Sequence, residues 1–309
     1  MIKGVIFDLD GTLLNTLEDL TKAINETMDD LSLPRQTITD TRNKIGSGFK
    51  NLLKQCVPEN YSDNQIDEAV KSFTGYYDKC YYEKTKPYTG IKELVDWCLD
   101  NNIKVGVNSN KKDLYTKKLI KLNFPGINED YVFGKRDNCP IKPDPCNNND
   151  ILKNMGLGNE EILYIGDSAV DIKTARNSKM KVVAVTWGYR DTDVLKENNP
   201  DFIVNKPGEI TDIIKKENGE KIMVEQTIEY RYDTQLLIEG ENLDEDAIND
   251  YFVENFKGDC LLAVGDEDLI KIHYHTNEPW KVLEYCRTLG EIYDIVVEDM
   301  DRQSRGLKG

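Results

Sequence analysis

The chain has 309 residues, of which 39% are hydrophobic, and its formal net charge at pH 7 is −16. This length predicts about two domains with packed cores. The sequence contains no apolar stretch of about 18 residues and no signal-peptide pattern at its start, so we expect no membrane association and a cytoplasmic location. Residues 220–309 carry most of the negative charge, which would repel phosphate backbones, and we expect no nucleic-acid partner.

The seven cysteines are odd in number and include no CxxC pair. This usage predicts a reducing compartment and no disulfide framework. The segment 215–221 is polar and contains a glycine, and the charge balance changes sharply after it. We therefore expect a linker there, between a first domain that ends near residue 214 and a second domain at 222–309.

The first predicted strand, residues 2–7, runs into the segment 7–12, FDLDGT. Ligands bind at the carboxyl ends of the strands in open α/β sheets, and side chains two positions apart on a strand point the same way. Asp8 and Asp10 could therefore share a hard cation, with one carboxylate acting as a nucleophile and the other carrying a proton. The competing interpretation is an ordinary Asp-Gly turn.

Further strands are expected along the first domain, separated by helical patterns. Their predicted positions are 103–107, 131–133, 162–165, 182–185 and 202–204. Strands that alternate with helices predict an α/β fold with a Rossmann-like parallel sheet.

A large insertion follows the first strand. In residues 15–85 apolar side chains recur three or four positions apart, as at Leu17, Leu20 and Ile24, which predicts helices. We expect this insertion to form a helical cap that lies over the site and gates it. The core of the first domain would then consist of residues 1–14 and 86–214.

Two later segments carry polar side chains with candidate roles at this site, and a third follows further along the chain. Ser109 and Asn110 follow the strand at 103–107, where a hydroxyl, an amide and backbone N–H groups can hold phosphate oxygens. Lys142 precedes Pro143, which favours an extended conformation, and its charge could stabilise a phosphoryl group. The alternatives are a hydrophilic loop and a surface lysine, which are commoner in general.

The strand at 162–165 ends in the segment 166–171, GDSAVD. Asp167 and Asp171 lie four residues apart at the carboxyl edge of the predicted sheet. Carboxylate oxygens are the ligands that a hard cation prefers, so these two acids extend the cation site suggested by Asp8 and Asp10.

Taken together, DxDGT, Ser-Asn after a strand, Lys-Pro and GDSxxD resemble the four-motif signature of the haloacid dehalogenase-like hydrolase superfamily. The resemblance covers about residues 1–214. The segments 45–48, 86–90 and 185–190 are most similar to the phosphoglycolate phosphatase branch with a helical cap. One departure is Asn15, where the family usually has Asp.

The resemblance implies a role for each acid. Asp8 would be the nucleophile that forms an aspartyl-phosphate, and Asp10 would protonate the leaving oxygen and then activate water. Mg²⁺ would be bound by the side chains of Asp8 and Asp167 and by the backbone carbonyl of Asp10, with Asp171 beside them. The phosphoryl oxygens would be held by three polar side chains, those of Ser109, Asn110 and Lys142. A dehalogenase needs no acid at Asp10, so the presence of this carboxylate favours phosphate chemistry.

The last ninety residues predict a different order of elements. These are a strand at 234–239, a helix at 244–256, strands at 260–264 and 269–275, a helix at 278–288 and a strand at 291–297. The order βαββαβ is typical of an α+β, ferredoxin-like domain. The segment 222–228 is predicted to add an edge strand.

His273 and His275 are the two histidines of the chain, and they share one face of the strand at 269–275. In a ferredoxin-like sheet this strand lies antiparallel to the strand at 234–239, which brings Asp233 to the same open face. Two imidazoles and a carboxylate could bind Zn²⁺. The alternative is a pair of histidines at the surface or in an interface.

Residues 225–303 resemble the middle region of dihydroxyacetone-kinase-like proteins, which include the catalytic component of fatty acid kinase. The likeness is carried by segments such as 230–234, YRYDT, 264–269, VGDEDL, and 272–276, IHYHT. In that family a cysteine usually stands at the position of Asp233 and completes a zinc site with the two histidines. The resemblance does not extend to the family's ATP-binding domain, so we expect no kinase activity.

The sequence therefore predicts an Mg²⁺-dependent phosphatase that acts on a small phosphorylated metabolite, similar to phosphoglycolate. The alternatives are a sugar phosphomutase of the same superfamily, or a regulatory protein that acts through its C-terminal domain. That domain is also where we expect a homodimer contact or a protein partner.

Overall fold

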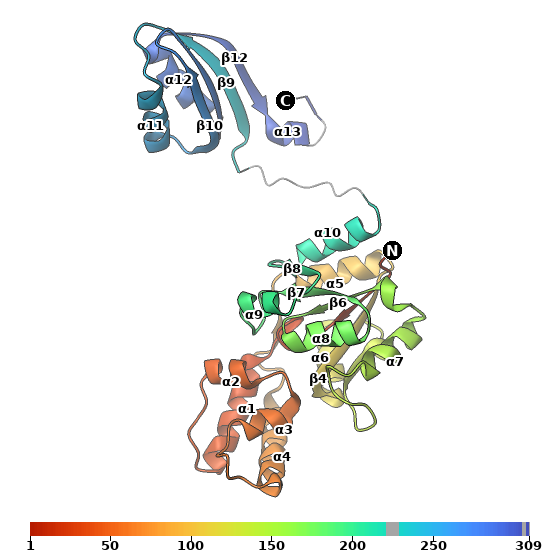
Figure 1. Ribbon diagram of the computed structural model, residues 1–309. Helices are drawn as coiled ribbons and strands as arrows, with labels where there is room; N and C mark the ends of the chain where they lie inside the picture. The colour runs from red at the N-terminus through yellow and green to blue at the C-terminus, as the bar shows by residue number, and fades with distance from the viewer. Residues whose placement is uncertain (221–228, 305–306, 309) are drawn as a thin grey trace. The chain divides into compact units, whose positions relative to one another are not determined.

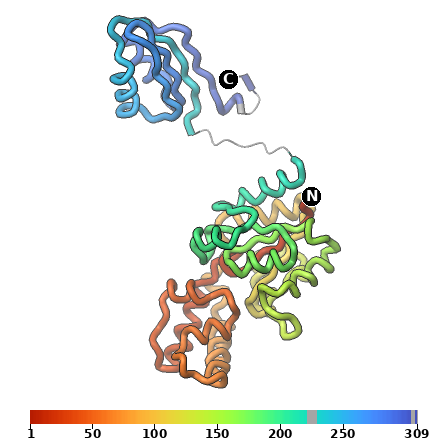
Figure 2. The backbone as a smooth tube through the Cα atoms, in the orientation of Figure 1, coloured from red at the N-terminus to blue at the C-terminus, as the bar shows by residue number. Residues whose placement is uncertain are grey.

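The computed structural model describes residues 1–220, 229–304 and 307–308. The chain divides into two compact units, Met1–Ile222 and Met223–Gly309 (Figure 2). None of the helices in the described ranges combines the length and the apolar character that crossing a bilayer requires. The edge strand expected at 222–228 lies outside the described residues.

The first unit is built on a six-stranded sheet in which all neighbouring strands run parallel, in the order β5-β4-β1-β6-β7-β8. The strands are β1 (Gly4–Phe7), β4 (Lys104–Lys112), β5 (Val132–Lys135), β6 (Ile162–Gly166), β7 (Lys181–Val185) and β8 (Phe202–Val204). All six predicted strands are present, which confirms the Rossmann-like α/β fold. Because β1 pairs with both β4 and β6, the carboxyl ends of these three strands lie side by side.

Helices cover both faces of this sheet (Figure 1). They are α5 (Ile91–Asp100), α6 (Asp113–Asn123), α7 (Cys146–Met155), α8 (Ala169–Asn177), α9 (Thr192–Glu197) and α10 (Gly208–Glu217), with short 3-10 turns at Glu129–Tyr131 and Asn159–Glu161. Side chains alternate along β1, so Phe7 packs with α5, α6 and α10, whereas Ile6 packs with α7, α8 and α9. This alternation buries β1 completely and fixes the direction in which its last residues point.

The insertion after β1 is helical, as predicted. It begins and ends at two short paired strands, β2 (Leu14–Asn15) and β3 (Lys86–Pro87). Between them lie α1 (Leu17–Asp30), α2 (Ile38–Lys44), α3 (Gly48–Lys54) and α4 (Asp63–Cys80). These helices pack around their own apolar cluster, in which Phe73 and Tyr77 are fully buried. Tyr115 of α6 and Tyr189 after β7 join this cluster, so the core of the cap is continuous with side chains of the sheet unit.

A buried carboxylate fastens the base of this cap. Asp19, in the first turn of α1, is 1% exposed and accepts hydrogen bonds from the backbone N–H groups of Lys84 and Thr85 at 2.8–3.0 Å. The Thr85 hydroxyl donates a further bond at 2.8 Å. A buried charge requires such partners, and here they join the two segments through which the chain enters and leaves the cap.

The second unit contains β9 (Tyr232–Glu239), α11 (Glu245–Asn255), β10 (Gly258–Gly265), β11 (Leu269–Thr276), α12 (Pro279–Leu289), β12 (Glu291–Asp299) and α13 (Met300–Ser304). Its antiparallel sheet has the order β10-β11-β9-β12. This is the βαββαβ order of the predicted ferredoxin-like α+β domain. Leu236, Ile272 and Phe252 belong to the core between sheet and helices.

Candidate active site

The residue directly after the buried strand β1 is Asp8, whose N–H donates to the carbonyl of Ile165 on β6 at 2.9 Å. The Oδ1 atom of Asp8 lies 2.7 Å from Nζ of Lys142. Burial raises the pKa of Asp8 well above its usual range; Lys142 opposes this shift, while Asp171 and Asp167 add to it. The nucleophile proposed from the sequence therefore lies in a buried site that gains from additional positive charge.

Lys142 connects two of the acids. Its Nζ lies 2.7 Å from Oδ1 of Asp8 and 2.7 Å from Oδ1 of Asp171. Burial acts to lower the pKa of Lys142, but the two carboxylates, Asp171 first, raise it well above its usual range. The lysine is therefore an ammonium ion that is held in place on two sides, as a group that binds phosphoryl oxygens requires.

Asp10 is held by two side chains to which the sequence analysis assigned no role. Its Oδ1 accepts a hydrogen bond from the Thr16 hydroxyl at 2.6 Å and forms an ion pair with Lys111 Nζ at 2.7 Å. Lys111 is buried, and its Nζ lies 5.1 Å from the centroid of the Tyr77 ring in the cap. Lys111 directly follows the Ser-Asn motif, and this position was the signal in the sequence that could have pointed to its role.

Asp167 follows β6, and its Oδ2 accepts the backbone N–H of Tyr189 at 2.6 Å. Burial raises the pKa of Asp167 to about 7, Asp171 contributes in the same direction, and the Tyr189 N–H opposes the shift. Gly11 packs directly against this carboxylate: its φ is +90°, and a Cβ there would lie 2.3 Å from Asp167 Oδ2. Only glycine combines this backbone conformation with such a close approach.

Asp171 is fully buried at the start of α8, and both of its carboxylate oxygens have partners. Oδ1 pairs with Lys142, and Oδ2 accepts the Ser168 hydroxyl at 2.5 Å. One ligand atom each from Asp8, Asp167 and Asp171 lies within 4.8 Å of the others, so the trio has the spacing of a metal site. Because the oxygens of Asp171 already have partners, Asp8 and Asp167 are the acids better placed to bind a cation.

Ser109 and Asn110 lie within the long strand β4. Ser109 Oγ accepts the backbone N–H of Lys111 at 3.1 Å and faces the pocket. Asn110 is used differently from the phosphate contact predicted for its side chain. Its Oδ1 accepts the Lys142 N–H at 2.8 Å, and its Nδ2 donates to the carbonyls of Gly46 at 2.9 Å and Lys142 at 3.4 Å. This amide therefore positions the Lys142 loop and contacts the cap.

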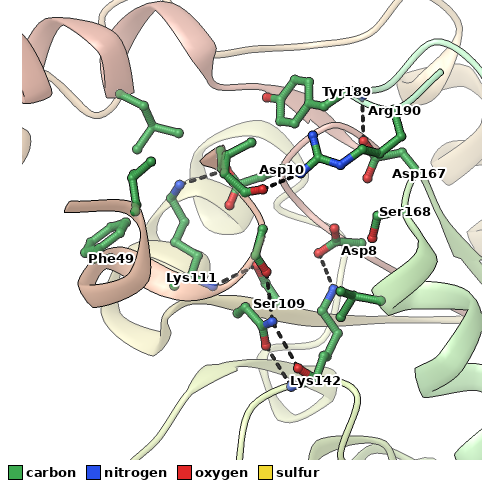
Figure 3. Close-up of a pocket in the computed structure, with 17 residues that line it drawn as sticks. Asp8, Asp10, Phe49, Ser109, Lys111, Lys142, Asp167, Ser168, Tyr189 and Arg190 are labelled. Carbon is green, nitrogen blue, oxygen red and sulfur yellow. Dashed lines mark hydrogen bonds and ion pairs between the residues drawn. The ribbon is translucent and has the colours of Figure 1, made fainter. Parts of the chain in front are cut away.

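These side chains surround a cavity of about 40 Å³ between the sheet edge and the cap (Figure 3). The cap closes it with an apolar wall formed by Leu20, Ile45, Phe49 and Leu52. A buried water occupies roughly 10–15 Å³ by the same measure, so the space is that of a few water molecules. The cap thus leaves only a small space above the sheet edge.

Two arginines fasten the cap to the loop after β7. Arg190 donates to the backbone carbonyls of Arg42 at 2.7 Å and Ile45 at 2.6 Å, while Arg42 Nε donates to the carbonyl of Tyr189 at 2.7 Å. The Tyr189 hydroxyl accepts the N–H of Thr16 at 3.0 Å. These contacts link the segment that covers the cavity to the segment that holds Asp167.

The loop that carries Lys142 contains a disulfide between Cys139 and Cys146, with a Cα–Cα distance of 5.9 Å. This bond departs from the expectation that the cysteines are reduced. The reason is local geometry, because the chain turns back between the end of β5 and the start of α7 and brings the two residues together. The other five cysteines are free thiols.

In the second unit the pairing of β11 with β9 places His275 opposite Asp233 and His273 opposite Gln235. Nε2 of His273 lies 3.2 Å from Oδ1 of Asp233 and 3.1 Å from Nε2 of His275. Nδ1 of His275 lies 3.0 Å from Oδ1 of Asp259. Asp233 Oδ1 is buried, and no hydrogen bond of acceptable geometry reaches it from the described residues. The three predicted side chains therefore converge on one point.

Comparison with known proteins identifies both units. Residues 5–185 match the family described as haloacid dehalogenase-like hydrolase. The chain belongs to this family. Residues 229–307 match the middle domain of the FakA-like family of fatty acid kinases. Both resemblances drawn from the sequence are thereby confirmed, and the first unit is a phosphatase-type hydrolase.

Individual relatives agree with the branch predicted from the sequence. A phosphoglycolate phosphatase of Photobacterium profundum is 30% identical over 224 residues, covering 69% of this chain and 96% of the relative. A candidate pyrophosphatase of Clostridium perfringens is 29% identical over 222 residues, covering 71% and 100%. The solved structure of a candidate phosphoglycolate phosphatase from Lactobacillus delbrueckii has a TM-score of 0.65 at 29% identity, covering 69% and 98%.

Proposed function

We propose that this protein is an Mg²⁺-dependent phosphatase that hydrolyses a small phosphorylated metabolite through an aspartyl-phosphate on Asp8. The observation that carries the proposal is the position of Lys142, whose charged amine lies 2.7 Å from the Asp8 carboxylate in the pocket beneath the cap. A phosphoryl group bound beside this amine would be within reach of the nucleophile. The family membership of the first unit supports the same reaction class.

The residues present fit a magnesium ion. Asp8 and Asp167 offer buried carboxylate oxygens within 4.8 Å of each other, and hard oxygen ligands are those that Mg²⁺ prefers. Burial, together with the neighbouring acids, raises the pKa of both carboxyls, so a cation bound beside them would favour their charged forms. Asp8, the backbone carbonyl of Asp10 and Asp167 would hold the ion, and when bound it would neutralise charge on the phosphoryl oxygens.

In the first step the Asp8 carboxylate attacks phosphorus, and a new O–P bond forms as the bond to the leaving oxygen breaks. Lys142 and Ser109 contact the phosphoryl oxygens during this transfer, and Asp171 keeps the lysine in position through its 2.7 Å ion pair. Two easier steps through an acyl phosphate replace one difficult displacement.

Asp10 moves the protons. Thr16 and Lys111 both contact its Oδ1, so we assign the transferred proton to Oδ2. Asp10 donates this proton to the leaving oxygen in the first step. Its carboxylate then takes a proton from the water that attacks the aspartyl-phosphate, and the Asp8–phosphorus bond breaks to release inorganic phosphate.

The small space of about 40 Å³ between the sheet edge and the cap favours a small substrate over a sugar bisphosphate, and so favours a phosphatase over a phosphomutase. A panel with Mg²⁺ that contains phosphoglycolate, pyrophosphate and hexose monophosphates would test this. We expect phosphate release to be fastest with a substrate of two or three carbons or with pyrophosphate. Conversion of one hexose phosphate into its isomer without release of phosphate would instead establish the mutase.

For the second unit we propose a divalent-cation site formed by Asp233, His273 and His275, with Zn²⁺ as the ion that this donor set suits best. The support is that Nε2 of His273 lies 3.2 Å from Oδ1 of Asp233 and 3.1 Å from Nε2 of His275, and that one ligand atom from each of the three residues lies within 4.8 Å of the others. The carboxylate stands where the related family has a thiolate, so we expect weaker binding than a Cys-His-His site would give.

Titration calorimetry of the full-length protein with Zn²⁺ would test this second site. We expect roughly one ion to bind through these side chains. His273→Ala should abolish that binding, whereas Asp8→Asn should leave it unchanged. Equal zinc affinity in the wild type and His273→Ala would show that the histidines are ordinary surface residues.

We also propose that the open face of this sheet contacts a protein, either a second copy of the chain or a different partner. The strands present exposed apolar side chains on that face, namely Leu262, Val264, Tyr293 and Val296. An apolar group of this kind rimmed by charged residues is typical of an interaction surface. Sedimentation of the purified protein would show whether the partner is a second copy.

A further inference from the structure

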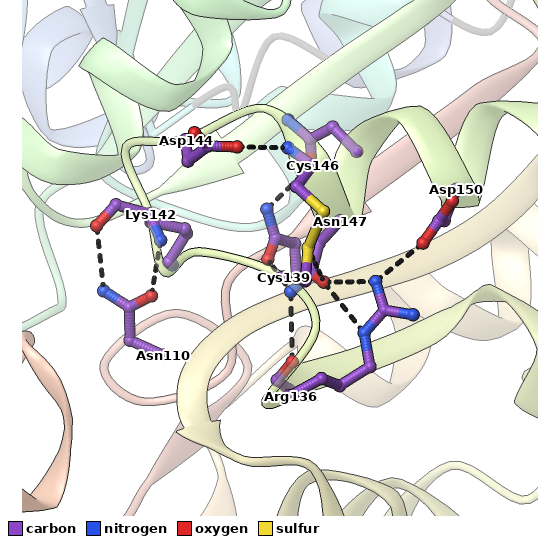
Figure 4. The surroundings of a disulfide bond; sticks show 11 residues. Asn110, Arg136, Cys139, Lys142, Asp144, Cys146, Asn147 and Asp150 are labelled. Carbon is purple, nitrogen blue, oxygen red and sulfur yellow. Dashed lines mark hydrogen bonds and ion pairs between the residues drawn. A yellow bond between two sulfur atoms is a disulfide. The ribbon is translucent and has the colours of Figure 1, made fainter.

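The disulfide closes a ring of eight residues around Lys142 (Figure 4). The ring runs from Cys139 to Cys146, and Lys142 lies near its middle. Within the ring, the Lys142 N–H binds Asn110 Oδ1 at 2.8 Å, and its Nζ reaches Asp8 and Asp171. A covalent bond outside the site thus constrains the loop that supplies the phosphoryl-binding amine.

One end of the ring is fixed to the protein core. Cys146 is the first residue of α7, and Asn147 beside it donates from Nδ2 to Asn108 Oδ1 on β4 and to the Gly134 carbonyl on β5, both at 3.1 Å. Arg136 donates to Asn147 Oδ1 at 2.7 Å. Because the start of α7 is anchored to two strands of the sheet, Cys146 is the rigid end of the bond.

The other end is held less firmly. Cys139 lies in the loop after β5, where its backbone forms an isolated bridge with Arg136. The disulfide joins this loop to the anchored end of α7. Breaking the bond would let the segment from Cys139 to Pro145 sample more conformations, and the arrangement that places Lys142 between its two carboxylates would be populated less of the time.

We propose that Cys139 and Cys146 form a reversible thiol–disulfide exchange site, whose oxidised form positions Lys142 for phosphoryl transfer and whose reduced form is less active. The inference rests on the phosphatase reaction proposed above and adds its regulation. The partner class is a dithiol reductant, with a disulfide as the oxidant in the reverse direction. In a reducing compartment, disulfides are usually transient or redox-sensing, so the predicted location suits this role.

The exchange balances without any further reactant. A thiolate of the dithiol attacks one sulfur of the pair, the Cys139–Cys146 bond breaks, and the other cysteine leaves as a thiolate. The second thiol of the reductant then displaces the first cysteine, so two protein thiols and one small cyclic disulfide are produced. Asn147 Oδ1 lies 3.1 Å from Cys139 Sγ and can accept a hydrogen bond from the thiol that forms.

The bond is reachable. An open hollow lined by residues 135–141 lies against Cys139, and Cys146 is partly exposed. Four of the five free cysteines are buried, and the fifth, Cys260, is exposed in the other unit and offers a matched control.

The test uses the full-length protein, fully oxidised or treated with dithiothreitol, with the state of each cysteine read by alkylation and mass spectrometry. With Mg²⁺ and p-nitrophenyl phosphate, reduction should lower kcat/KM by about tenfold, since small displacements of positioning groups have effects of this order or larger. Reoxidation should restore it. Cys139→Ser/Cys146→Ser should stay at the reduced level with and without dithiothreitol, while Cys260→Ser should respond like the wild type.

Hydrogen exchange supplies a readout that does not depend on turnover. Backbone amides of residues 139–146 should exchange faster after reduction, and those of the α7 end should change little. Faster exchange in a protein that hydrolyses no phosphoester in either state would support the loop inference and contradict the phosphatase proposal. Equal exchange and equal kcat/KM in forms shown to be fully oxidised and fully reduced, or a bond that resists the dithiol in the folded protein, would overturn the inference.

Discussion

Replacing Asp8 by Asn tests the nucleophile with the smallest change that the structure allows. The amide has the same size as the carboxylate, and its oxygen can still accept a hydrogen bond from Lys142, which keeps its 2.7 Å ion pair with Asp171. No cavity is created in the buried site. The substitution therefore removes the attacking oxygen and one negative charge and leaves the packing unchanged.

The expected loss of activity is large. Removal of a catalytic nucleophile costs about 10⁴-fold or more in kcat, which corresponds to a barrier higher by about 5 kcal/mol. The folded state should not suffer, because burial and two neighbouring acids disfavour the charged form of Asp8, as the raised pKa of this side chain shows. We expect the melting temperature of metal-free Asp8→Asn to equal or exceed that of the wild type.

The assay is release of p-nitrophenol from p-nitrophenyl phosphate with saturating Mg²⁺, alongside thermal unfolding of each protein. Asp96→Asn is the control: Asp96 is exposed on α5, so this substitution makes the same chemical change outside the pocket. Its kcat should match that of the wild type. If folded Asp8→Asn turned over within tenfold of the wild type, Asp8 would not be the nucleophile.

Three further predictions follow from the same site. The pKa of Asp167 is raised from its usual value of 3.8 to about 7, so the stability that this side chain contributes is lost as the pH rises from about 3.8 to about 7. Calorimetry in EDTA should show this decline. Mg²⁺ should raise the melting temperature more at pH 8 than at pH 5. Gly11→Ala should lose most Mg²⁺-dependent activity, because its Cβ would lie 2.3 Å from Asp167 Oδ2; near-normal kinetics would show that the loop can yield. A chain ending at Glu220 should fold and keep phosphatase activity, because it retains Asn218, whose side chain forms hydrogen bonds with the backbone of Ile2. If this truncated protein were insoluble or inactive while the full-length control was active, the second unit would be essential.

The convergence of much of the candidate site could be predicted from the sequence, because its residues follow local patterns. Asp8 and Asp167 directly follow short apolar runs, and each run is a strand that ends at the same edge of a parallel sheet. Once the alternation of strands and helices predicts such a sheet, the convergence of these residues follows from chain direction alone. The same reasoning brings Asp233 beside His275 in the antiparallel sheet of the second unit.

The tertiary structure decided the contacts that no local pattern specifies. Lys111 and Thr16 reach Asp10 from segments with their own periodicities, and the pairing depends on how β4 and the cap pack beside β1. The side chain of Asn110 supports the Lys142 loop because that loop folds over the end of β4, a proximity between residues 32 positions apart.

The disulfide shows the same limit most directly. The number and spacing of the cysteines favoured free thiols, whereas the turn between β5 and α7 sets Cys139 and Cys146 at bonding distance. Sequence patterns report which side chains a strand or helix presents, because backbone geometry repeats every two or 3.6 residues. They do not report how far an irregular loop doubles back, since that depends on packing against elements distant in the chain.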